Sequence, residues 1–103
     1  MSNEKNKWID AIAKLITLTQ ERKLIWRTRN EFDDNDVRTI YEADYAGKLL
    51  RLRGYRSLYL VDPATDVEWD FPDSEGIAHL MEAVKYQLVG AGNFLDDLFA
   101  KVG

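Results

Sequence analysis

Acidic side chains crowd residues 66–76, DVEWDFPDSEG, and no other part of the sequence looks more like a site of chemistry. Asp66, Glu68 and Asp70 occupy every second position, so a β-strand would place all three on one face. Carboxylate oxygens are the ligands that hard cations such as Mg²⁺ and Ca²⁺ prefer. Alternate residues of a strand lie about 7 Å apart, however, so these carboxylates cannot converge on one ion without help from another segment. We therefore expect a solvated strand face, with no bound metal and no cofactor.

One enzymatic alternative stays open, a carboxylate-dependent metalloenzyme centred on Glu68, Asp70 and His79. His79 is the only histidine of the chain, and a helix would place it near Glu75 and Glu82. Such a group can bind a divalent ion, or it can form ordinary surface pairs at helical spacing. With one histidine and no cysteine, the sequence offers no recognisable triad and no Cys–His nucleophile. We therefore expect no catalytic residues and a protein that is not an enzyme.

Basic and aromatic residues interleave between residues 48 and 59, and this mixture indicates a second alternative. Arg51, Arg53, Arg56 and Tyr59 could hold phosphates and stack bases on a sheet, as single-stranded nucleic-acid-binding proteins do. The net charge of −4 argues against nucleic acid as a partner, because affinity for phosphate comes from clustered lysines and arginines.

The C-terminal segment FLDDLF, residues 94–99, carries the leading functional hypothesis. On a helix, Phe94, Leu95, Leu98 and Phe99 form one apolar stripe, and the two aspartates between them lie opposite. Such a stripe can dock in the groove of a partner, or it can fold back over the sheet as part of the core. We interpret the chain as a small non-enzymatic protein-binding or adaptor module, either immunity-like or self-associating, with these four residues as the contact site.

The hydrophobic pattern predicts a single α+β domain over residues 1–103, with an N-terminal helix, an antiparallel meander of four or five strands and two C-terminal helices packed on one sheet face. This order resembles that of many small bacterial proteins, and bacterial immunity proteins and small adaptors often have a similar size and acidity. The resemblance is one of architecture alone. The predicted elements are a helix at 7–20, a strand at 23–30, a loop at 31–37, a hairpin at 38–56, strands at 57–62 and 67–71, a helix that Asp73 or Ser74 caps, and a last helix at 94–102 that Asn93 caps.

Two features of the predicted sheet fix its register and its outer face. A two-residue turn at Ala46–Gly47 would place Tyr41 opposite Leu52 and Glu42 opposite Arg51. The outward residues then form alternating basic and acidic rows that cancel one another, and each opposite-charge pair contributes about 0.2–1 kcal/mol. From the first strand to the last, these rows are Arg27 and Arg29, Glu42 and Asp44, Arg51 and Arg53, Glu68 and Asp70.

The composition agrees with one ordinary globular domain. Hydrophobic residues make up 46% of the 103, enough for a core without disulfides, and the lack of cysteine fits a reducing compartment. No segment reads as a secretory signal or approaches the ~20 apolar residues that span a bilayer, so we expect a cytoplasmic protein without a membrane partner. The expected core consists of Trp8, Ile12, Leu15, Trp26, Tyr41, Leu50, Leu52, Leu58, Leu60, Trp69, Phe71, Leu80, Met81, Val84, Leu88 and Phe99.

Overall fold

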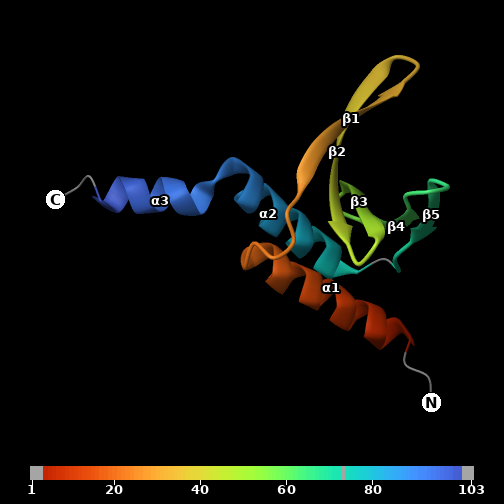
Figure 1. The fold of residues 1–103 in the computed structure, drawn as a ribbon, viewed down its shortest axis with the longest axis horizontal. Helices are drawn as coiled ribbons and strands as arrows, with labels where there is room; N and C mark the ends of the chain where they lie inside the picture. Colours follow the sequence, from red (N-terminus) through yellow and green to blue (C-terminus); the bar gives the residue numbers. More distant parts are fainter. Residues whose placement is uncertain (1–3, 73, 101–103) are drawn as a thin grey trace.

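A computed structural model describes residues 4–72 and 74–100, and it confirms the predicted α+β class and order of elements (Figure 1). Five antiparallel strands form one sheet in the sequential order β1-β2-β3-β4-β5, a meander with no crossover. In chain order the elements are α1 (Glu4–Gln20), β1 (Arg27–Asp33), β2 (Asp36–Tyr45), β3 (Lys48–Gly54), β4 (Ser57–Asp62), β5 (Val67–Asp70), α2 (Glu75–Val89) and α3 (Ala91–Ala100).

The first hairpin differs from the prediction. Its strand begins at Arg27, not at residue 23, and it continues to Asp33 through the segment that was expected to be a loop. β2 starts at Asp36, and the pairing runs without a break from Arg27–Glu42 to Asp33–Asp36. The end of this hairpin is exposed on both faces, so no core there requires apolar residues at alternate positions. A polar strand of this kind lacks the period-two hydrophobic signal on which the prediction relied.

Residues 21–26 connect α1 to β1 and are held by one side chain of α2. The Gln87 amide nitrogen donates to the backbone carbonyls of Thr19 and Leu24, at 3.0 and 2.9 Å. The Gln87 amide oxygen accepts from the backbone N–H of Trp26, at 2.8 Å, while the indole N–H of Trp26 donates to the Thr19 hydroxyl, at 3.0 Å. These bonds satisfy backbone groups at the end of α1 and bury Trp26 before the sheet begins.

The second hairpin is confirmed. The pairing of β2 with β3 includes Tyr41–Leu52 and Glu42–Arg51, and the turn residues Ala46 and Gly47 both have positive φ, 51° and 79°. Positive φ at both central positions is the two-residue turn whose twist matches that of the strands. The expected irregularity at Gly54 is present as a shift in the β3–β4 register, with φ at 151°.

α1 and α2 pack side by side against one face of the sheet, and α3 extends away from both (Figure 1). The close approach of the two helices relies on Gly76, since a Cβ atom at that position would lie 2.9 Å from Cγ2 of Ile12. Ser74 caps α2, because its hydroxyl accepts from the N–H of Gly76. The other expected cap, Asp73, lies outside the described residues. α3 starts at Ala91, so the predicted cap Asn93 lies inside the helix.

Most of the predicted core is confirmed. The buried cluster contains Ile12, Leu15, Trp26, Leu50, Leu52, Leu58, Phe71, Leu80, Met81 and Val84, with Trp8, Tyr41 and Leu60 partly buried against it.

Three of the expected core residues are instead exposed: Trp69, Leu88 and Phe99. Trp69 lies on the edge strand β5 and packs against the rings of Trp8 and Phe71, with the Trp8 ring centroid 4.5 Å away. Leu88 and Phe99 lie in the last turn of α2 and in α3. The helical part that contains them extends past the sheet (Figure 1).

Replacing Gln87 with leucine should lower the free energy of unfolding by about 1–3 kcal/mol, because the substitution leaves buried backbone groups at Thr19, Leu24 and Trp26 without partners. Urea denaturation measures the change. The matched control is Gln20→Leu at the exposed end of α1, which should change the value by less than about 0.5 kcal/mol. Equal effects of the two substitutions would contradict the assigned role of Gln87.

Candidate functional site

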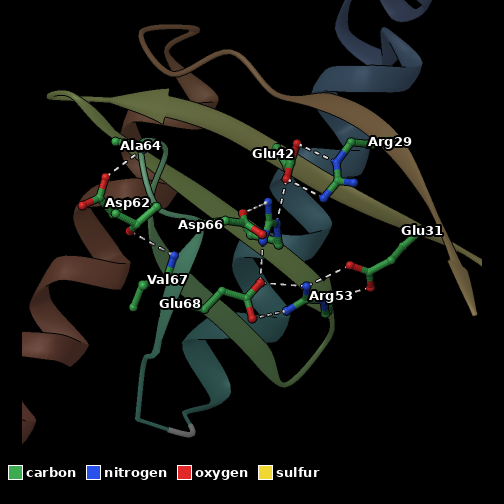
Figure 2. Close-up of polar contacts among 11 residues, drawn as sticks. Arg29, Glu31, Glu42, Arg53, Asp62, Ala64, Asp66, Val67 and Glu68 are labelled. Carbon is green, nitrogen blue, oxygen red and sulfur yellow. Dashed lines mark hydrogen bonds and ion pairs between the residues drawn. The ribbon is translucent and has the colours of Figure 1, made fainter.

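The sheet face opposite the helices carries the predicted rows of charge, and they pair across the strands (Figure 2). Arg27 donates to Asp44 at 3.1 Å, and Arg29 makes two hydrogen bonds of 3.1 Å to the carboxylate of Glu42. Arg51 also donates to Oε2 of Glu42, at 2.7 Å. The alternation of basic and acidic rows inferred from the sequence is therefore confirmed for β1, β2 and β3.

Arg51 is the centre of this network. Its exposed fraction is 5%, that of Glu42 is 4%, and the guanidinium also contacts Asp66, at 3.3 Å, and Glu68. Three carboxylates thus surround one buried cation. Within residues 6–72 and 74–100, no fully buried side-chain nitrogen or oxygen lacks a hydrogen-bond partner. Burying a charge costs free energy unless it is paired and hydrogen-bonded, and this geometry provides both.

Arg53 closes the network toward β5. It binds Glu31 through two parallel hydrogen bonds, at 3.0 and 2.9 Å, and it also donates to Glu68, at 2.9 Å. Figure 2 shows Glu31 and Glu68 approaching Arg53 from opposite sides. The guanidinium carbon lies 4.8 Å from the ring centre of Tyr59, within the range of a cation–π contact.

The residues of the nucleic-acid alternative are therefore largely engaged with one another and with carboxylates. A phosphate would have to displace Glu42 or Glu68 from Arg51, and Glu31 or Glu68 from Arg53. Arg56 lies outside this cluster, on the exposed turn between β3 and β4. The structure brings Arg51, Arg53 and Tyr59 together, but it places acidic groups among them.

The residues of the metalloenzyme alternative are not brought together. Glu68 bridges two arginines, and His79 lies on α2, where it lines a groove between the helices. Asp70 is exposed on β5 and pairs in register with Tyr59. Among the residues that the structure describes, there is no group of three or more acidic, histidine or cysteine side chains that could hold a metal ion.

The arginines lower the pKa of three glutamates. Hydrogen bonds from Arg53 lower the pKa of Glu31 and Glu68 against an opposing effect of burial. For Glu42, burial alone would raise the pKa, but hydrogen bonds from its two arginine partners outweigh it, so the pKa lies below its ordinary value. The same contacts raise the pKa of Arg51 and Arg53 despite burial, so the network is fully ionised near neutral pH.

The sequence analysis missed one member of the network, Glu31, which it placed in a loop. The available signal was the spacing of Arg27, Arg29 and Glu31 at every second residue, which extends one strand face past the predicted end. Asp66 was placed on the correct face, but its contact with Arg51 spans 15 residues of sequence and depends on the turn before β5.

α3 presents the four residues expected to bind a partner, and no residue of this helix is buried. The exposed fractions of Phe94, Leu95, Leu98 and Phe99 are 64%, 40%, 46% and 73%. The helix leaves the body of the protein at its N-terminal end and projects from it (Figure 1).

The polar side of α3 borders a groove of about 820 Å³ between the three helices. Asn93 and Asp96 line this groove from α3, together with Ile16 and Arg22 near the end of α1 and Tyr86 of α2. At 3.6 residues per turn, these two α3 positions lie on the side of the helix away from Leu95 and Leu98. The apolar stripe therefore turns away from the body of its own chain.

Comparison with known proteins gave no match to any family model, any curated protein or any solved structure. None of the helices within residues 4–100, residue 73 apart, combines the length and apolarity needed to cross a membrane. A functional interpretation therefore rests on the two surfaces described above, the charged sheet face and the apolar side of α3.

Replacing Arg51 with methionine should lower the free energy of unfolding by about 3–5 kcal/mol, because it leaves the buried carboxylate of Glu42 with only one of its two arginine partners. The matched control, Arg27→Met, removes an exposed pair and should change the value by no more than about 1 kcal/mol. Chemical denaturation of both variants tests this. Similar losses of unfolding free energy in the two variants would show that the burial of Arg51 and Glu42 adds nothing to stability.

Acid should destabilise the fold through Glu31, Glu42 and Glu68. Because their pKa values are lowered in the folded state, their contribution is complete above the ordinary value of 4.5 and is lost as the pH falls through the lower folded-state values. Denaturation curves from pH 7 to pH 2 should therefore show a fall that begins near pH 4.5. A Glu42→Gln/Glu68→Gln variant should show a shallower fall than Asp97→Asn on α3, and identical pH profiles would refute the assignment.

Proposed function

We propose that this protein is a non-enzymatic protein-binding module and that its contact surface is the apolar side of α3. One observation carries the proposal: α3 directs its polar side toward the groove beside α1 and α2 and leaves its four large apolar side chains exposed. An adaptor or an immunity protein would use such a surface to cover a second protein without acting on it. The absence of cysteine supports a reducing compartment such as the cytoplasm.

The length of α3 supports the same conclusion. Ten residues are fewer than the ~12–15 that an isolated helix needs to be even marginally stable in water, so α3 depends on packing for most of its stability. Its own chain offers little packing, since α3 has no buried residue. A contiguous apolar patch on a projecting element is typical of an interaction site, because burial of that patch stabilises both the contact and the helix.

The charged sheet face supports this assignment indirectly. Arg51 and Arg53 are held by carboxylates of the same chain, so they attract neither phosphate nor a further acidic partner strongly. Opposite charges in alternate rows also cancel at a distance, because the separation of the rows is smaller than the ~8–10 Å screening length of physiological salt solutions. This leaves the apolar side of α3 as the surface with the most free energy to gain from a contact.

A binding experiment with a matched pair of variants tests the proposal. The chain is immobilised, and proteins that it retains from a cell extract are identified and purified. Each is then titrated calorimetrically against three forms of the chain: wild type, Leu95→Asp/Leu98→Asp and Phe32→Ser. Phe32 is as exposed as the α3 residues but lies on the first hairpin. The expected result is a defined stoichiometry with wild type and Phe32→Ser, and an affinity at least about 100-fold lower with the α3 variant.

Two results would contradict the proposal. One is a partner whose affinity is unchanged by the aspartates at 95 and 98. The other is the absence of any protein, a second copy of this chain included, that binds through α3.

A further inference from the structure

The partner itself can be inferred from the sequence of the α3 stripe, and this step rests on the function proposed above. Residues 94–99 read Phe-Leu-Asp-Asp-Leu-Phe, which is the same in both directions. In an antiparallel pair centred on this segment, each residue lies level with a residue of the same type, phenylalanine with phenylalanine and leucine with leucine. We propose that α3 pairs with α3 of a second copy of this chain, around a two-fold axis at the level of the Asp96–Asp97 bond.

The spacing of the stripe fits a two-helix seam. Leu95 and Leu98 are three residues apart and correspond to the a and d positions of one heptad, while Phe94 and Phe99 occupy the flanking g and e positions. The aspartates fall at b and c, away from the seam. In the antiparallel pair, Leu95 lies level with Leu98 of the second copy, and the axis at the midpoint of the stripe brings all four stripe residues of each helix to the seam or its flanks.

The direction of the pairing follows from the rest of the molecule. α3 joins the body of the protein at its N-terminal end, so antiparallel pairing places the two bodies at opposite ends of the seam (Figure 1). Parallel pairing would place side by side the bodies of two chains that each carry a net charge of −4. Antiparallel helix dipoles also attract, whereas parallel ones repel. The C-terminal half of α3 then approaches the end of α2 of the second copy, where Val89 is 77% exposed.

The apolar area is sufficient for a weak dimer. Taking roughly 150–200 Å² for a fully exposed large side chain, the exposed fractions of the four stripe residues and Val89 correspond to about 450–600 Å² per chain. The pair would bury about 900–1,200 Å², close to the ~1,000 Å² of the smallest specific interfaces. We therefore expect dissociation on dilution, with a Kd on the order of micromolar.

Sedimentation equilibrium of the full chain between about 1 and 200 µM tests the dimer. Wild type should shift from one to two chain masses within this range, and Phe32→Ser should do the same. Leu95→Asp/Leu98→Asp should stay monomeric at every concentration, with a circular dichroism spectrum that confirms a folded body. Wild type that remains monomeric at 200 µM, or a dimer that both variants retain equally, would overturn the inference.

Charge substitutions test the antiparallel direction. Antiparallel helices bring the g positions of the two copies to the same side of the seam, whereas parallel helices bring g of one copy to e of the other. Phe94→Lys and Phe94→Glu should therefore each be monomeric alone and form a dimer when mixed. The chain with both Phe94→Lys and Phe99→Glu should stay monomeric. The reverse pattern, a dimeric double variant and no dimer in the mixture, would contradict antiparallel pairing.

The same variants separate this inference from the proposed function. If wild type is monomeric but binds another purified protein through α3, the second copy is excluded and the protein-binding function stands. If wild type is monomeric and no protein binds through α3, both fail.

Discussion

The contact between Arg51 and Glu42 is the constraint on which the rest of the sheet depends. Both side chains are buried, they face each other across the central strand pair, and their atoms lie 2.7 Å apart. A slip of one residue between β2 and β3 would turn one of the two strands over, which would place Glu42 and Arg51 on opposite faces of the sheet and move the apolar side chains of that strand away from the helices. The buried ion pair and the apolar core therefore require the same register, and a one-residue slip disrupts both.

This arrangement has a consequence for function. A sheet face with Arg29, Arg51 and Arg53 could have served as a track for phosphate, but carboxylates from β1, β2 and β5 bind their guanidinium groups. The network stabilises the protein from within and neutralises its own surface. Four large apolar side chains stay exposed along one side of α3, a helix with no buried residue that projects from the rest of the described chain. Structure and surface chemistry thus separate: the sheet carries the fold, and the contact that we propose lies on the C-terminal helix.

Much of the fold could be predicted from the sequence because its signals were local. Ala46–Gly47 permits positive φ, and the period-two pattern on either side sets the pairing of β2 with β3 and hence the charge rows. The full length of the first hairpin was missed, because a strand exposed on both faces shows no hydrophobic alternation and is marked only by the spacing of its charged residues. Gln87 was equally hidden, since its contacts join residues more than 60 positions apart and involve backbone groups that carry no sequence signal.

The candidate site was predictable as a set of residues but not as a surface. An amphipathic helix can cover its own core or a partner's, and the pattern of Phe94 to Phe99 is the same in both cases. The burial of Leu88 and Phe99 was predicted wrongly for this reason: the helical spacing was correct, but the end of α2 and α3 extend past the sheet that would have covered them. Only the position of α3 in three dimensions shows whether its apolar side chains cover the core of their own chain or remain exposed.

A double-mutant cycle on Glu42 and Arg51 tests the central claim most directly. Unfolding free energies of wild type, Glu42→Gln, Arg51→Met and the double variant give the energy of coupling between the two side chains. The account predicts about 2–3 kcal/mol, because each single substitution leaves a buried group incompletely paired and the double variant does not. A coupling energy near zero would contradict the claim that this ion pair fixes the sheet.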